Sequence, residues 1–370
     1  MSSERLPAEK ILIRVPNWVG DAVLSLPALR ALRDSFPAAE LVVLARPHVA
    51  DLYRGVTEVN RVLLLELADG AGLLRAAAQL RREQFDLAVL FQNAFQAALL
   101  AALAGIPRRV GYRRDARGWL LTHPIPVPHP GETPAHESYY YLELLRRAGW
   151  LETLPRLSHI PLRPDPTLAA AMEARWRELG AGNGRLRVVI APGAAYGSAK
   201  CWLPERFAAL ADRLAERFDA RVVLAGTRAE AELVKRIVAA MQSRGVSLVG
   251  QTSLPEFLAL LSRAQFFIGN DSGAMHLAAA VGLPSVMIFG PTDEAGTGPL
   301  SLRAHIVKQP VSCSPCFLRH CPVDHRCMTR VGVEDAWQAI EAALADSSLV
   351  VRALGSEASP PYFGGQGVIE

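Results

Sequence analysis

The sequence predicts an α/β protein built from two doubly wound domains that face each other across a cleft. The chain has 370 residues and is 50% hydrophobic, which is enough to form two cores, since a single core usually stops growing at roughly 250–300 residues. Short β-branched runs alternate with helical periods along both halves, a pattern typical of parallel sheets with helices on both faces. A glycine-rich interruption at residues 180–184 separates the two series. We therefore predict domains at residues 1–178 and 185–346, and a tail at 347–370 that is disordered toward its end.

In the first domain, alternation of this kind predicts strands and helices in turn. The expected strands are residues 11–15, 41–45, 62–65 and 87–91, and the expected helices are residues 22–34, 73–82 and 137–148. The apolar stretch 87–106 contains Gln92, Asn93 and Gln96. Because a bilayer offers those amides no water to bond, we interpret this stretch as a buried strand and helix. Residues 122–130, rich in Pro and His, are predicted to form an extended loop.

The second domain repeats the pattern. The expected strands are residues 187–191, 221–225, 265–268 and 285–289, and the expected helices are residues 205–218, 229–241, 255–262 and 274–281. In doubly wound sheets, ligands bind beyond the carboxyl ends of the strands. Loops from both domains are therefore predicted to line one shared cleft.

Charge and the amino-terminal residues limit the class of protein. The formal net charge is +4, which is too small to indicate a nucleic-acid partner, whereas a local anionic partner fits the basic residues between 108 and 117. The first ten residues, MSSERLPAEK, contain no apolar run of the kind found in secretory signals. A cytoplasmic protein is expected.

The most informative segment is residues 268–292, IGNDSGAMHLAAAVGLPSVMIFGPT. The strand predicted at 265–268 leads through Asp271 into a turn at Ser272 and Gly273, where a helix begins. Such a helix start presents unpaired N–H groups and the positive end of the helix dipole, which suit a phosphate. His276 lies on the same helix face as Ser272 and can donate to a phosphate or a sugar. The alternative for His276 is a packed core histidine.

Three further loops of the second domain lie at carboxyl ends of predicted strands. Residues 191–202 supply Gly193, Ser198 and the compact charge of Lys200 for a phosphate, although similar loops also occur as ordinary surface turns. This loop lacks the Gly-Lys-Ser/Thr ending of a Walker A motif, and neither domain has a G-x-G-x-x-G motif. Residues 224–227 and 250–253 are natural places for a base and a ribose. The candidates there are Thr227, Glu230 and Thr252.

Two features of the first domain point to an acceptor. Asp21 ends the loop 16–21 at the mouth of the cleft and can accept a proton, or it can instead cap the helix that follows. Arg113, Arg114 and Arg117 can hold an anionic acceptor through charge-assisted bonds. The alternative for these arginines is a solvated charged loop.

Four cysteines form a cluster near the end of the second domain, at Cys313, Cys316, Cys321 and Cys327. Thiols this close together suggest a thiol-rich loop or a structural zinc site, although the spacing is not that of paired C-x2-C motifs. Disulfides are less expected in a cytoplasmic protein.

Together, residues 15–32, 191–210, 270–293 and 313–322 resemble the lipopolysaccharide heptosyltransferases of glycosyltransferase family 9, and among these the type II enzymes. The resemblance extends to about residue 345. It implies a GT-B architecture of two Rossmann-like domains, the first binding the acceptor and the second the ADP-sugar. The implied reaction is inverting transfer of L-glycero-D-manno-heptose from ADP-heptose to the first heptose of the inner core. The alternatives are a type I or other family 9 enzyme, a sugar-nucleotide epimerase, and a non-catalytic nucleotide-sugar binding module.

The resemblance also implies residue roles. Asp21 becomes the general base, with the ordinary pKa of an aspartate, and Asn17 lies on the acceptor side. Lys200 holds the donor phosphates, while the turn at Asp271 and His276 hold the diphosphate and sugar. Arg228 stands near where a ribose-binding carboxylate is expected, a departure from the family pattern. No cofactor is implied. The lipid-linked inner-core acceptor implies a peripheral contact with the inner membrane.

Overall fold

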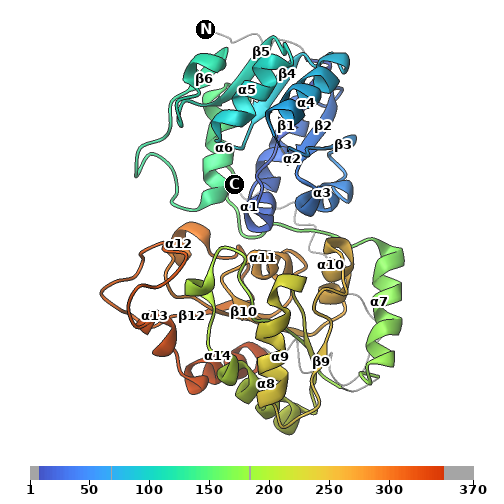
Figure 1. Cartoon of the computed structure of the whole chain (residues 1–370), viewed down its shortest axis with the longest axis vertical. Coiled ribbons are helices and arrows are strands. Elements are labelled where there is room, and N and C mark those ends of the chain that lie inside the picture. Colours follow the sequence, from blue (N-terminus) through green and yellow to red (C-terminus); the bar gives the residue numbers. More distant parts are fainter. Residues whose placement is uncertain (1–7, 68, 183–184, 346–370) are drawn as a thin grey trace, which may run out of the picture.

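The computed structural model describes residues 8–67, 69–182 and 185–345. Within these ranges the chain forms two lobes, one above the other in Figure 1, and each lobe contains a six-stranded parallel sheet. The tail predicted at residues 347–370 lies outside the described residues.

The first lobe has the strand order β3-β2-β1-β4-β5-β6, which is the Rossmann order. Its elements in chain order are β1 (Lys10–Arg14), α1 (Val19–Leu24), α2 (Leu26–Ser35), β2 (Glu40–Ala45), α3 (Pro47–Arg54), β3 (Arg61–Leu64), α4 (Gly70–Arg82), β4 (Leu87–Leu90), α5 (Phe95–Leu103), β5 (Arg108–Tyr112), η1 (Gly118–Leu120), β6 (His123–Ile125) and α6 (Glu137–Arg147).

The second lobe has the order β12-β11-β10-β7-β8-β9, which is the same topology. Its elements are β7 (Arg187–Ala191), η2 (Ser198–Lys200), α8 (Pro204–Phe218), β8 (Arg221–Leu224), η3 (Arg228–Glu230), α9 (Ala231–Ala240), β9 (Val246–Ser247), α10 (Leu254–Ser262), β10 (Phe266–Asn270), α11 (Gly273–Ala280), β11 (Ser285–Ile288), α12 (Glu294–Thr297), β12 (Ala304–Val307), α13 (Arg326–Thr329) and α14 (Val333–Ala345).

Alternate residues of the central strands bury into different apolar clusters. Ile11 and Ile13 of β1 pack into one cluster, whereas Leu12 packs into another on the opposite face of the sheet. All three side chains are almost completely buried. A strand buried on both faces is typical of parallel sheets covered by helices, as predicted.

Local differences from the predicted elements have physical causes. The helix expected at 22–34 is two helices, α1 and α2, because Pro27 has no N–H to continue the ladder. The loop expected at 122–130 begins with β6, which pairs with β5, so the basic segment starting at Arg108 is partly a strand. The remaining residues of that predicted loop are irregular, as expected.

Helix α7 (Pro166–Glu178) falls in the predicted first domain but packs with the second lobe, as both views show. Its Trp176 is fully buried and donates from Nε1 to Leu260 O of α10 at 3.4 Å. Its Glu173 pairs with Arg187 of β7 at 2.6 Å. The chain therefore passes between lobes before α7, and the glycine-rich residues near 180 are a turn within the second lobe.

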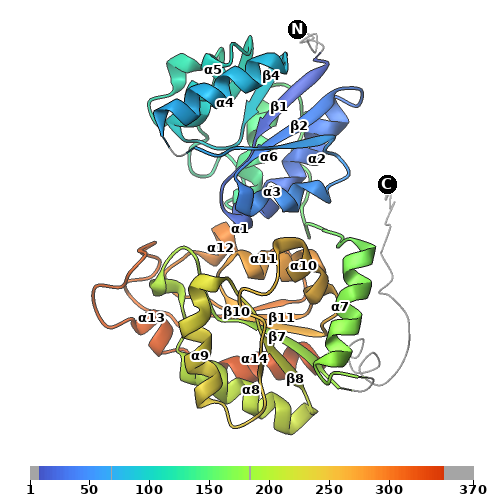
Figure 2. The same ribbon diagram turned by 45° about the vertical axis from the view of Figure 1, so that its right-hand side comes forward.

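The lobes meet through α1, α3 and α6 above and α10, α11 and α12 below (Figure 2). Across this boundary His136 Nε2 lies 2.9 Å from Gly298 O. Among the described residues, no helix is long and apolar enough to cross a membrane.

Candidate active site

The site lies where the two lobes meet, at the carboxyl ends of β1, β7 and β10. In each sheet the strand order reverses beside β1 or β7, and a ligand crevice is expected at such a point. The starts of α1 and α11 pack closely against each other, with the side chains of His276 and Val19 against the glycines of the opposite helix start. A Cβ added to Gly20 would lie 2.9 Å from His276 Cδ2, and one added to Gly273 would lie 2.8 Å from Val19 Cβ. These glycines allow the two helix starts to approach.

Asp21 lies in the first turn of α1 rather than at its N-cap, which is Trp18. The capping alternative for Asp21 therefore does not describe this helix. Burial raises the pKa of Asp21 to about 6, with Lys200 lowering it and Asp271 raising it. The ordinary pKa expected from the sequence is thus too low. A carboxylate with a pKa near 6 is still mainly ionised at neutral pH and is a stronger base than an exposed aspartate.

Lys200 faces Asp21 from the second lobe and is held by Asp271. Its Nζ lies 2.5 Å from Asp271 Oδ2, and Thr292 Oγ1 donates to the same oxygen at 2.6 Å. Lys200 Nζ also lies 4.9 Å from the centre of the Tyr196 ring. The side chain of Asp271 is 4% exposed and that of Lys200 13%. Asp271 thus orients the ammonium group of Lys200, whereas the sequence predicted that Asp271 itself contacts the donor.

Ser272 is the N-cap of α11, yet its hydroxyl makes no capping bond. Its Oγ is buried without a hydrogen-bond partner in the part of the chain described here. Buried hydroxyls are normally bonded, so this group has capacity for a ligand oxygen. The preceding Asn270 ties the turn to the Lys200 loop, since its side chain bonds Pro192 O at 2.6 Å and Trp202 N at 3.1 Å.

His276 is 6% exposed and lies against Gly20 of the other lobe. Burial lowers the pKa of His276 to about 4. The imidazole is therefore neutral at physiological pH and offers one donor and one acceptor. It is a packed residue, as in the second alternative raised by the sequence, and it lies close enough to Asp271 and Lys200 to interact with them electrostatically.

Glu230 lies beside two glycines at the carboxyl ends of β7 and β8. A Cβ on Gly193 would lie 1.7 Å from Glu230 Oε1, and one on Gly226 would lie 2.5 Å from Oε2. Oε2 accepts from Thr227 N at 2.6 Å and from Thr227 Oγ1 at 3.0 Å, forming a capping box. The carboxylate is held in place with Oε1 facing the Gly193 loop. Thr252 lies half-buried just before α10.

The cysteine-bearing segment, residues 313–325, lies against the loop that carries Lys200. Ser198 Oγ bonds His320 Nδ1 at 3.0 Å, and Ala199 N donates to Arg319 O at 3.0 Å. Tyr196 OH donates to Phe317 O at 2.7 Å. We call residues 313–325 the strap. Ser198, predicted to bind the donor, is engaged by the strap.

The four clustered cysteines are free thiols, of which Cys313 and Cys316 are exposed and Cys327 is buried. Burial raises the pKa of the Cys327 thiol. Among the described residues, no group of three or more His, Cys, Asp or Glu side chains is arranged to hold a metal ion. The structure therefore does not support the structural zinc suggested by the spacing.

The predicted acceptor residues divide into two groups. Arg113 and Arg114 are exposed, and Arg114 NH1 donates to Tyr140 OH at 3.3 Å. Arg117 is fully buried, and its guanidinium bonds Tyr112 O, Gln92 O and Asn93 Oδ1. It ties strand ends together and has no exposed surface for an acceptor. The fourth predicted residue, Asn17, is half-buried in the loop before Asp21, and Arg14 donates to its Oδ1 at 2.7 Å.

Glu137, in the first turn of α6, was not predicted as a site residue. Burial and, to a lesser extent, the charge of Asp21 raise its pKa to about 7. Its neighbour His136 makes the contact with Gly298 across the lobes. The one signal in the sequence was its position at the start of the helix that follows the Pro/His-rich segment. Acidic residues are common in the first turn of any helix, so this position did not mark Glu137 as a site residue.

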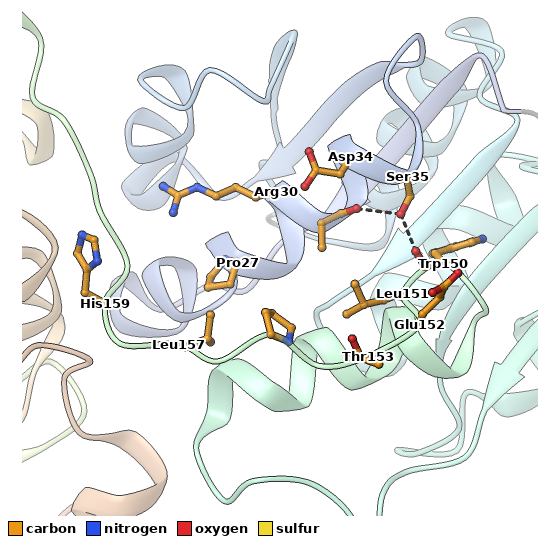
Figure 3. Close-up of a pocket in the computed structure, with 12 residues that line it drawn as sticks. Pro27, Arg30, Asp34, Ser35, Trp150, Leu151, Glu152, Thr153, Leu157 and His159 are labelled. Carbon is orange, nitrogen blue, oxygen red and sulfur yellow. Dashed lines mark hydrogen bonds between the residues drawn. The ribbon is translucent and has the colours of Figure 1, made fainter. Parts of the chain in front are cut away.

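A separate hollow of about 510 Å³ lies between α2 and the segment that leads to the second lobe (Figure 3). Its lining includes Arg30, Trp150 and His159, and Ser35 Oγ bonds Trp150 O at its edge at 2.7 Å. None of the site residues described above in this subsection lines it. This hollow is therefore distinct from the candidate active site.

Comparison with known proteins identifies the relatives of the chain. A family model described as glycosyltransferase family 9 (heptosyltransferase) matches residues 73–326. Lipopolysaccharide heptosyltransferase 2 of Escherichia coli strain K12 is 30% identical over 308 residues, covering 81% of this chain and 88% of the relative. Lipooligosaccharide heptosyltransferase 2 of Haemophilus ducreyi is 28% identical over 317 residues, covering 81% and 88%.

Solved structures agree with this assignment. The E. coli ADP-heptose lipopolysaccharide heptosyltransferase II has a TM-score of 0.78 at 27% identity, covering 92% of this chain and 99% of that chain. The family 9 glycosyltransferase of Veillonella parvula has a TM-score of 0.79 at 19% identity, covering 92% and 98%. A UDP-N-acetylglucosamine 2-epimerase from Listeria monocytogenes has a TM-score of 0.53 at 11% identity, with 94% and 91% covered, a likeness of fold alone. The predicted two-domain α/β fold is confirmed.

Proposed function

Because the chain belongs to glycosyltransferase family 9, we propose that it moves L-glycero-D-manno-heptose from ADP-heptose to the first heptose of the lipopolysaccharide inner core. The observation that carries the proposal is that Asp21 of the first lobe and Lys200 of the second lie close enough to interact electrostatically where the lobes meet. One lobe supplies a base for an acceptor hydroxyl. The other supplies positive charge for a leaving diphosphate.

The donor is assigned to the second lobe. Lys200 and the N–H groups at the start of α11 would hold the two phosphates, and the unpartnered Ser272 hydroxyl would bond a phosphate oxygen. Glu230 Oε1, on the Gly193 side of the capping box, would accept from a ribose hydroxyl. Thr227 and Thr252 are placed at the nucleoside end. His276, neutral at physiological pH, would donate to the sugar or a phosphate.

The proposed reaction is a single in-line displacement. The ionised carboxylate of Asp21 takes the proton of the acceptor hydroxyl while that oxygen forms a bond to the anomeric carbon. The bond from this carbon to the phosphate oxygen breaks on the opposite side, so the configuration inverts and ADP leaves. Lys200 and the α11 N–H groups stabilise the charge that grows on the diphosphate, as fixed dipoles do in other enzymes.

The acceptor is assigned to the first lobe. Asn17, Arg113 and Arg114 lie on its side of the cleft, whereas Arg117 would act by holding the strand ends beneath them. Since the proposed acceptor is lipid-linked, we infer that the enzyme works on the cytoplasmic side of the inner membrane, in peripheral contact with it. No cofactor is assigned to the reaction.

Two observations favour this function over the other candidates. The type II relative from E. coli strain K12 matches 81% of this chain, whereas lipopolysaccharide heptosyltransferase 3 of E. coli is 28% identical and matches 74% of this chain. Burial raises the pKa of Asp21, which lies near Lys200. A carboxylate with a raised pKa suits a catalytic base, and a binding module without catalysis has no use for one.

The test is incubation of the enzyme with ADP-heptose and an inner-core acceptor that carries one heptose, with product detected by mass spectrometry. Addition of one heptose is expected, with release of ADP in equal amount. ADP release without an extended acceptor would contradict the assigned acceptor, and epimerised donor without ADP release would indicate an epimerase. Ser272→Ala should raise the KM for ADP-heptose more than the KM for the acceptor.

A further inference from the structure

Arg14, at the end of β1, is a buried cation without an anionic partner. Its side chain is 4% exposed. Its guanidinium bonds Val15 O, Leu44 O and Asn17 Oδ1, all of which are neutral. Among the described residues, no carboxylate lies within ion-pair distance of it. Burying a charge with neutral partners alone is costly, and proteins usually compensate such a charge with an opposite one.

The guanidinium lines a small cavity at the carboxyl ends of β1 to β4. The cavity has a volume of about 30 Å³, more than the roughly 10–15 Å³ that one water needs. Its polar lining consists of Arg14, Asn17, Arg46, Gln92 and Gln96, and no acidic residue lines it. Leu65, Leu67, Ala94, Ala97 and Leu100 line the rest of it, so the space is small, partly apolar, and faced by positive but no negative side chains.

The second cation, Arg46, follows β2 and is half-buried. Burial and, to a lesser extent, the charge of Arg46 lower the pKa of Arg14 to about 10. Two like charges near one cavity repel each other, and an anion between them would relieve both the repulsion and the burial cost. The backbone of Gln92 is fixed at the same place, because its backbone N–H donates to the backbone oxygen of Arg14 at 3.1 Å.

We propose that Arg14 and Arg46 bind an oxyanion of the acceptor, a phosphate or a sugar-acid carboxylate, in this cavity. The assignment rests on the proposed function, in which the first lobe holds the acceptor. Asn17 connects the cavity to the chemistry, since it lines the cavity, bonds Arg14 and lies in the loop that leads into α1, four residues before Asp21. Guanidinium groups suit the task because they bond oxyanions with two parallel N–H groups.

The first experiment needs no substrate. Inorganic phosphate is titrated into the wild-type enzyme and into Arg46→Gln, with binding followed by calorimetry. The wild type should bind phosphate, and the variant should bind about tenfold more weakly. Arg54→Gln is the matched control, because Arg54 lies on the adjacent helix, is exposed and pairs only with Asp51 in the described part of the chain. It should bind phosphate as the wild type does.

The second experiment measures transfer. Arg46→Gln should raise the KM for the acceptor about tenfold and leave the KM for ADP-heptose unchanged, while Arg54→Gln changes neither. Treating the acceptor with phosphatase separates the two sources of the oxyanion. If wild type and Arg46→Gln then have the same KM for the acceptor, the oxyanion is a phosphate; if their KM values still differ, it is a carboxylate. Arg14→Lys keeps the charge, and its KM for the acceptor should lie between the values of the wild type and Arg46→Gln.

Equal phosphate affinity in wild type and Arg46→Gln would overturn the site. If Arg46→Gln binds phosphate more weakly but has an unchanged KM for the acceptor, the cavity is a site for free anions, and the proposal that it binds the acceptor is overturned. If no heptose is transferred at all, the proposed function fails, but the phosphate titration still decides whether the cavity binds oxyanions.

Discussion

Lys200 and Asp271 form an ion pair of 2.5 Å that joins the loop after β7 to the turn after β10. Because both side chains are largely buried, the pair is not a surface contact that solvent screens. Its geometry fixes the ammonium group at the cleft before any substrate binds. Such preorganised charge is the kind of interaction that stabilises a leaving diphosphate without reorganisation.

Removing either partner of this pair should have different effects. Lys200→Met should lower kcat by roughly 100-fold and weaken donor binding, because the cation itself is lost. Asp271→Asn should lower kcat less, since the ammonium remains but is no longer held. The double variant should resemble Lys200→Met alone, as expected for residues that act together. Additive losses in kcat would show that Asp271 acts independently of Lys200.

The activity should depend on pH through Asp21. A base works when deprotonated, so kcat/KM should fall as the pH drops through about 6, the pKa of Asp21. The pKa of His276 is about 4, too low to produce this limb. Glu137→Gln removes a group with a pKa of about 7 and should leave the limb near 6 in place. A pH–rate profile in which that variant lacks the limb would assign it to Glu137 instead.

Gly20→Ala should separate the starts of α1 and α11. The new methyl would lie 2.9 Å from His276 Cδ2, and overpacking of this kind costs about 1–3 kcal/mol. We expect a lower kcat and a lower Tm. Gly55→Ala is the matched control, because φ there is −90° and nothing lies within 4 Å of the added Cβ. Full activity in Gly20→Ala would mean that the two helix starts need not approach this closely.

The strap should help to position the Lys200 loop. A Cβ on Gly197 would lie 2.2 Å from Arg319 O, so Gly197→Ala must displace the strap or the loop. The KM for ADP-heptose should rise several-fold, with the acceptor KM unchanged. Gly182→Ala, which meets nothing within 4 Å, serves as the control. Unchanged donor kinetics in Gly197→Ala would remove any role for the strap in donor binding.

Much of the fold followed from sequence patterns because parallel strands in such sheets are continuous apolar runs. The central strands β1, β4, β7 and β10 were predicted within a few residues for this reason. Other strands were missed where the signal is weak: β9 has two residues, β6 contains a proline, and β5 begins with two arginines. The lobe to which α7 belongs depends on the partners of Trp176 and Glu173, which lie about 80 and 14 positions away and leave no local pattern.

The site was predictable in its parts but not in its connections. Glycines, a lysine and a helix start marked the loops, because phosphate binding requires those residue types. The sequence could not show that Asp271 holds Lys200, that Arg117 is buried, or that burial raises the pKa of Asp21. Each of these depends on side chains brought together by tertiary packing, and ordinary pKa values apply only to exposed groups.

The most direct test of the central claim compares wild type and Asp21→Asn on ADP-heptose with inner-core acceptors that carry no heptose or one heptose. We predict transfer to the one-heptose acceptor, a loss of at least about 100-fold in the variant, and ADP-heptose binding by the variant as tight as by the wild type. Asp21→Asn should also be no less stable, since burial disfavours the ionised carboxylate that it removes. Transfer only to the heptose-free acceptor would indicate a type I enzyme, and transfer by Asp21→Asn at the wild-type rate would contradict the assignment of the base.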